Sequence, residues 1–71
     1  MQVQIPDHVV AYMVRKGTTL TMAQDVVDAV ERPTLTMEED GKTVFITSKV
    51  TVSGFPDKTG KFFRVSRVDF D

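Results

Sequence analysis

Two alternating segments that meet at Asp40-Gly41 constrain the fold more than any other part of the sequence. An Asp-Gly pair between such segments is a strong indication of a β-hairpin with a two-residue loop. That loop fixes the register, which then brings opposite charges together and apolar side chains together. The predicted cross-strand pairs are Glu39 with Lys42, Met37 with Val44, Thr36 with Phe45, and Leu35 with Ile46.

The segment after the loop, residues 43–52, has apolar side chains at most even positions and polar side chains at most odd positions. A period of two is typical of a strand with one buried face and one wet face. Ser48 and Phe45 are the exceptions, one in each set. We therefore expect one long central strand whose even side chains build the core, with Phe45, Thr47 and Lys49 on its exposed face.

The N-terminal part of the chain predicts a short strand over residues 1–5 and then two helices. We expect the first helix to begin at His8, with Asp7 as its cap, and to end at the glycine that follows two basic residues. Thr21 and Gln24 have the spacing of a capping box, which predicts the start of the second helix. A proline then prevents this helix from continuing.

The C-terminal part predicts a turn-rich loop over residues 53–60 and a final strand over residues 61–70. The apolar phase of this strand slips by one position, which indicates a β-bulge near Ser66-Arg67. The predicted order is β-α-α-β-β-β. We expect one α+β domain over residues 1–71, with two layers: two helices on one face of an antiparallel sheet of three or four strands.

The composition excludes several classes of protein. The chain has 71 residues, one histidine and no cysteine, so disulfides and cysteine-based metal sites are excluded and a transition-metal site is not expected. Its apolar stretches are amphipathic, and no basic segment precedes an apolar run at the N-terminus, so we expect neither a signal peptide nor a membrane span. These features favour a cytoplasmic protein.

Charge is distributed unevenly along the chain, although its net value is only −1. Up to Gly41 there are three basic and seven acidic residues, whereas residues 42–68 contain six basic residues and one acidic residue. Such an asymmetry is compatible with an ordinary solvated surface and also with a site for an anionic partner. Both alternatives stay open from the sequence.

No set of residues predicts a reaction. His8 stands in the first turn of a helix without a matching nucleophile, which favours a surface histidine. Glu38, Glu39 and Asp40 are expected to form a solvated hairpin tip, since no loop of alternating oxygen ligands surrounds them. We therefore expect no catalytic residue, no metal and no cofactor, and the sequence favours a non-enzymatic protein.

The exposed face of the predicted sheet is the candidate binding surface. Basic residues interleaved with an exposed aromatic can bind single-stranded nucleic acid, and the same composition is found on an ordinary solvent-exposed sheet face and at protein interfaces. We favour a small interaction or regulatory protein, of the kind encoded by phages and mobile elements, that binds a protein partner through its sheet face or a strand edge. RNA binding and a homodimer are the alternatives. The candidate partner-binding residues are Phe45, Thr47, Lys49, Arg64 and Arg67.

One stretch and the element order resemble the RelE-like toxin superfamily, in particular its BrnT-like members. The resemblance rests on His8, Arg15-Lys16-Gly17 and Leu20-Thr21, which stand where that group has a histidine, a basic helix end and the entry to a second helix. It implies a ribonuclease acting on RNA, with Lys49, Arg64 and Arg67 in the places of its basic sheet residues.

Overall fold

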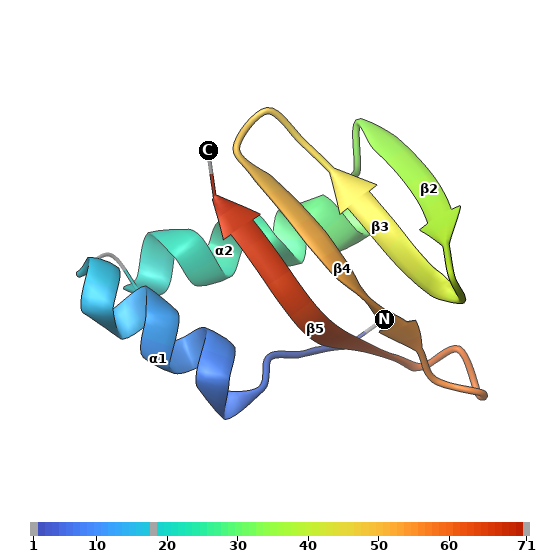
Figure 1. Ribbon diagram of the computed structural model, residues 1–71, viewed down its shortest axis with the longest axis horizontal. Helices are drawn as coiled ribbons and strands as arrows, with labels where there is room; N and C mark the ends of the chain where they lie inside the picture. The colour runs from blue at the N-terminus through green and yellow to red at the C-terminus, as the bar shows by residue number, and fades with distance from the viewer. Residues whose placement is uncertain (1, 18, 71) are drawn as a thin grey trace.

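A computed structural model describes residues 2–17 and 19–70 (Figure 1). The predicted α+β class is confirmed: two helices pack on one face of a five-stranded, mostly antiparallel sheet. The sheet has one strand more than predicted, and Met1 of the predicted first strand lies outside the described residues. The elements are β1 Gln2–Gln4, α1 Asp7–Lys16, α2 Thr19–Glu31, β2 Leu35–Glu39, β3 Lys42–Ile46, β4 Val50–Pro56 and β5 Phe62–Phe70.

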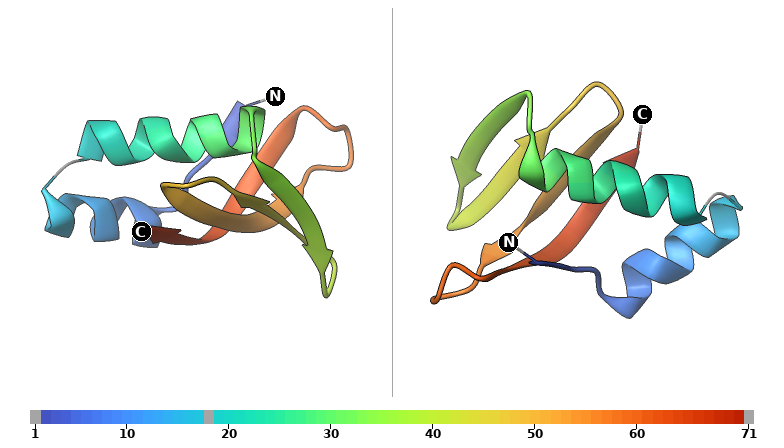
Figure 2. Two further views of the ribbon diagram at one scale, coloured as in Figure 1. Left: turned by 90° about the horizontal axis from the view of Figure 1, so that it is seen from above. Right: turned by 180° about the vertical axis from the view of Figure 1, so that it is seen from behind.

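The strands follow the order β1-β5-β4-β3-β2 across the sheet. The strands β2 to β5 pair antiparallel to their neighbours, whereas β1 pairs parallel to β5. Helix α2 crosses β4 on one face of the sheet, and α1 packs against α2 and lies beside the outer edge of β5 (Figure 2). The opposite face of the sheet, here called the open face, carries no helix in the described part of the chain. Strand β2 forms the edge farthest from α1 (Figure 1).

The hairpin of β2 and β3 has the register predicted from the sequence. Leu35 pairs with Ile46, Met37 with Val44, and Glu39 with Lys42. Asp40 and Gly41 have φ angles of 51° and 80°, as both central residues of a type I′ turn require. Because only residues that tolerate a positive φ fit this turn, Asp40-Gly41 fixes the register locally.

The prediction of one long strand over residues 43–52 is wrong. The chain turns at Thr47, whose hydroxyl oxygen accepts hydrogen bonds of 3.2 Å from the backbone N–H groups of Lys49 and Val50. This side-chain-to-backbone bonding gives the chain an alternative to a continuous strand. The run is therefore divided into β3 and β4, which pair with each other.

The turn also reverses the phase of the side chains. Phe45 of β3 pairs with Val52 of β4, and since Val52 is buried against the helices, Phe45 shares its face. Val44 and Ile46, which were expected in the core, lie on the open face instead. The alternation of apolar and polar residues continues on the far side of the turn in the same even–odd phase, so the sequence pattern does not reveal the turn.

Both predicted helix starts are also wrong in detail. Pro6 occupies the N-cap position of α1 without a side-chain cap, and Asp7 lies within its first turn. The second helix begins at Thr19, so Thr21 is inside it, and the Gln24 amide donates to Asp28 instead of closing a capping box. The predicted ends of both helices are confirmed.

In the C-terminal part, β4 extends to Pro56, so the predicted loop over residues 53–60 is shorter than expected. The predicted bulge is confirmed: Ser53 pairs with Arg67 and Gly54 with Val65, which leaves Ser66 as the extra residue. The core between sheet and helices consists of Val9, Met13, Val26, Ala29, Val30, Val50, Val52, Phe63 and Val65.

Candidate functional site

Phe45 does not lie on the open face, so the predicted placement of this residue is wrong. Its ring packs edge-to-face on Phe63, with 5.0 Å between the ring centroids and 62° between the planes. Phe63 is buried in the core, and Phe45 is partly buried beside it. Phe45 is therefore part of the packing between sheet and helices.

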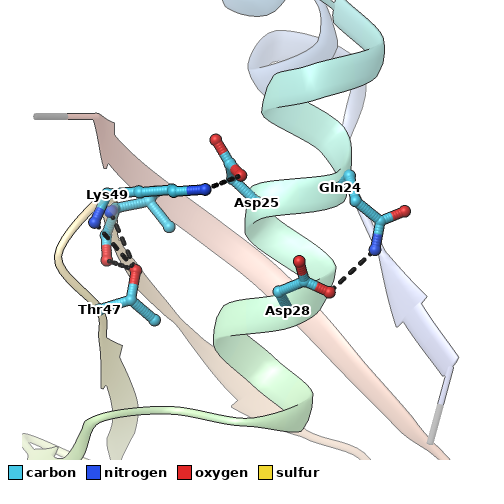
Figure 3. A network of polar contacts seen from close by, with 6 residues as sticks. Gln24, Asp25, Asp28, Thr47 and Lys49 are labelled. Atoms are coloured by element: carbon cyan, nitrogen blue, oxygen red, sulfur yellow. Dashed lines mark hydrogen bonds and ion pairs between the residues drawn. The ribbon is translucent and has the colours of Figure 1, made fainter.

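Thr47 and Lys49 lie in the turn between β3 and β4, away from the centre of the sheet. Thr47 is occupied by its hydrogen bonds within the turn. The ammonium of Lys49 is 3.9 Å from the carboxylate of Asp25 on α2, next to the hydrogen bond between Gln24 and Asp28 (Figure 3). The Lys49 side chain is 73% exposed, so this ion pair contributes little stability.

The two arginines lie together on the open face. Arg64 pairs with Phe55 across the sheet, and Arg67 pairs with Ser53. Arg64 and Arg67 are three positions apart, an odd spacing that would place them on opposite faces of a regular strand, but the extra residue of the bulge lets both point away from the helices. Arg67 also forms an ion pair of 3.2 Å with Asp69. Of the five predicted residues, the structure thus brings only Arg64 and Arg67 onto one face.

Sequence reasoning missed an apolar strip on the open face. Leu35 and Met37 of β2 are 52% and 45% exposed, and each pairs with an apolar residue of β3. No helix covers this strip in the described residues. A contiguous exposed apolar patch marks an interaction site more often than an isolated apolar side chain does. We define the apolar strip as Leu35, Met37, Val44 and Ile46.

Strand β2 is exposed on both of its faces: all five of its residues have exposed side chains. Its outer edge also has unpaired backbone groups. The backbone N–H of Thr47 donates to the carbonyl oxygen of Val50 across the turn. Because backbone groups alternate in direction along an antiparallel strand, the N–H and C=O groups of the odd residues of β3 point towards β4, and those of the even residues point towards β2. The backbone N–H and C=O groups of Thr36 and Glu38 therefore point outward, away from the sheet.

The opposite edge of the sheet is protected. Strand β1 has three residues and pairs with β5 only as far as Arg64. Beyond that point α1 lies next to β5, and His8 of this helix is 3.1 Å through its Nε2 from the carbonyl oxygen of Ser66. A short strand and a covering helix are two ways in which proteins block an edge. Strand β2, by contrast, is five residues long, and no element of the described residues covers its outer edge.

A second feature of the open face lies near the loop between β4 and β5. Phe55 is 42% exposed, and the ammonium of Lys42 is 5.9 Å from the centre of its ring. With Phe62 and Arg64 it lines a shallow depression of about 340 Å³. Sequence reasoning missed Phe55 because residues 53–60 were assigned to a loop, whereas Phe55 is part of β4.

One carboxyl group of this loop has a perturbed pKa. The hydroxyl and the backbone N–H of Thr59 donate hydrogen bonds to the side chain of Asp57 and hold the pKa of Asp57 below its usual 3.8. The bonds stay within the loop, so they stabilise the turn and do not indicate acid–base chemistry.

Comparisons with known proteins assign no family. No protein-family model matches the chain, and neither a curated protein nor a solved structure matches it. The structure contains the β-α-α-β-β-β order on which the resemblance to RelE-like proteins rests, with the long predicted strand divided into β3 and β4, but no family match supports that resemblance. Within residues 2–17 and 19–70, no cluster of three metal-ligating side chains occurs, and neither helix is long and apolar enough to cross a membrane.

Proposed function

We propose that this chain is a non-enzymatic interaction protein that binds a protein partner at β2, through its free edge and the apolar strip beside it. The observation that carries the proposal is the exposure of Leu35 and Met37 on an edge strand that neither helix of residues 2–17 and 19–70 covers. Proteins normally protect such an edge with charges, a bulge or a covering element. In the described residues, β1 and α1 protect the other edge, whereas the charges of β2 stand only at its C-terminal end and leave Leu35 and Met37 exposed beside a free edge.

Burial of this surface by a partner would supply a useful part of the binding free energy. Full burial of a Leu or Met side chain is worth about 1.5 to 3 kcal/mol. Because Leu35 and Met37 are already about half covered, each has about 1 kcal/mol left to gain from a partner. Backbone hydrogen bonds along the edge would also fix the orientation of the partner segment. In strand addition these bonds supply affinity, and the side-chain contacts supply specificity.

The test compares Met37→Lys with Val14→Lys. Val14 is 59% exposed on α1, far from β2, so the control adds the same charge elsewhere. A protein captured from the source cell is identified, purified and titrated against wild type and both variants. We expect Met37→Lys to weaken binding at least tenfold, which corresponds to about 1.4 kcal/mol, and Val14→Lys to leave it unchanged. Equal binding by all three proteins would refute the proposal.

A toxin-like ribonuclease is the second candidate. Arg64 and Arg67 share the open face with the exposed ring of Phe55, and arginines beside an aromatic ring suit single-stranded RNA. Lys49 lies apart from them, in the β3–β4 turn. The RelE-like reading requires that wild type bind and cleave RNA at low salt and that Arg64→Ala with Arg67→Ala abolish cleavage. Absence of RNA binding at low salt would exclude it.

A further inference from the structure

We infer that the partner segment is an extended basic strand, which adds antiparallel to β2 with two basic residues opposite Glu38 and Glu39 and two apolar residues opposite Leu35 and Met37. This inference rests on the proposed function and specifies the chemistry of the partner. It follows from the backbone, the two faces and the charge of β2.

The backbone sets the first condition. The outward N–H and C=O groups of Thr36 and Glu38 offer two donors and two acceptors along the free edge. An extended segment satisfies them by continuing the ladder that β2 and β3 have begun. Antiparallel pairing is the more frequent arrangement, and it matches the neighbouring pairs of this sheet.

The two faces of β2 set the second condition. On the open face β2 presents Leu35, Met37 and then Glu39, and on the helix side it presents Thr36 and Glu38. A partner with apolar residues at two alternate positions would extend the apolar strip by one more strand. A basic residue at the next position on that face would then stand opposite Glu39.

Charge sets the third condition. Glu38, Glu39 and Asp40 are consecutive and exposed, and neither ion pair of the described residues involves any of them. Lys42, the nearest base across the hairpin, lies over the ring of Phe55. A basic strand neutralises the carboxylates that the hairpin leaves unpaired, and opposite charges across a strand pair are stabilising.

A second copy of this chain would leave the same carboxylates without a base. Two copies paired antiparallel through β2 about a two-fold axis at Met37 would place Glu38 opposite Thr36 and Glu39 opposite Leu35. The other copy of β2 contains no lysine or arginine, so these carboxylates would gain no ion-pair partner from it. The other edge strand, β1, has only three residues to pair with β2.

The experiment uses two synthetic peptides with the central sequences Lys-Lys-Val-Thr-Val and Glu-Glu-Val-Thr-Val, titrated into the full chain by NMR. We expect wild type to bind the basic peptide about tenfold more tightly, because two cross-strand charge pairs change sign. The double variant Glu38→Lys, Glu39→Lys should reverse this preference. Both positions are exposed, so the variant is expected to fold.

Two further measurements separate the outcomes. N-methylation of the peptide at the residues whose N–H groups face β2 should abolish binding, whereas methylation at the alternate residues should not. No preference between the peptides, or a wild-type chain that is a dimer through β2, would overturn the inference. If the peptides fail while Met37→Lys still weakens binding of a purified partner, the proposed function stands and only the basic-strand chemistry is wrong.

Discussion

Replacement of Phe45 by alanine tests the placement of β3 in the sheet. Truncation of a buried phenylalanine costs about 3 to 5 kcal/mol. Because Phe45 is only partly buried, we expect a loss of about 3 kcal/mol in the free energy of unfolding, of which about 1 kcal/mol comes from the edge-to-face contact with Phe63. A domain of this length has a total of about 4 to 10 kcal/mol, so the variant should remain folded but weakened.

The matched control is Phe55→Ala, because Phe55 is the same residue type on the open face and is 42% exposed. We expect its removal to cost about 1 kcal/mol or less. Urea unfolding followed by circular dichroism measures both values. The melting temperature of Phe45→Ala should fall by about 12 to 24 °C, at about 4 to 8 °C per kcal/mol for a domain of this size.

The reasoning is refuted if Phe55→Ala destabilises the protein as much as Phe45→Ala does. That result would mean that Phe45 faces solvent, as a continuous strand over residues 43–52 would require. Should Phe45→Ala fail to fold, Phe45→Leu provides the milder comparison, and it must still cost more than Phe55→Leu.

Three smaller perturbations test other parts of the fold. A Cβ at Gly54 would overlap with the carbonyl oxygen of Arg64, so Gly54→Ala should lower the free energy of unfolding by about 1 to 3 kcal/mol in urea titrations. An unchanged urea midpoint would contradict the close approach at the bulge. Gly41→Ala places a Cβ at a φ of 80° and should cost about 1 to 2 kcal/mol, which a neutral result would disprove. The lowered pKa of Asp57 means that its ionised form stabilises the loop above pH 3.8, and this stabilisation is lost as pH falls through the lowered pKa. Thr59→Ala should return the pKa of Asp57 towards 3.8 in an NMR titration. An unchanged pKa would exclude Thr59 as the cause.

The sequence was sufficient for those features that rest on local chemistry. The hairpin register follows from Asp40-Gly41, since a two-residue turn with positive φ at both positions leaves one pairing. The bulge near Ser66 follows from a slip in the apolar phase of the last strand. The α+β class follows from the order of periodic segments.

The faces of the sheet could not be derived in the same way. The turn at Thr47 depends on a side-chain hydroxyl that bonds to the backbone of the next residues, and three polar residues inside an alternating run do not disclose it. Missing that turn misplaced Phe45 on the open face. The position of Phe55 in a strand was not predicted for a related reason. The sequence Gly-Phe-Pro is typical of a loop, whereas the bulged pairing with β5 keeps these residues in β4.

Lys49 shows a third kind of difficulty. Its odd position in the alternating run of residues 43–52 predicted the exposed face of a strand, whereas its ion-pair partner Asp25 comes from α2. Such a contact depends on how the helix lies across the sheet, which no local pattern reveals. The proposed binding surface therefore lies at β2 and not at the centre of the sheet, a difference that depends on how the helices pack.

Amide hydrogen exchange along β2 tests the central claim most directly. In the free protein we expect fast exchange at Thr36 and Glu38, whose N–H groups point outward, and slower exchange at Leu35, Met37 and Glu39, whose N–H groups face β3. A bound partner or basic peptide should slow exchange at Thr36 and Glu38 and leave the edge at β1 unchanged. If binding protects residues elsewhere and exchange at Thr36 and Glu38 stays fast, β2 is not the docking strand.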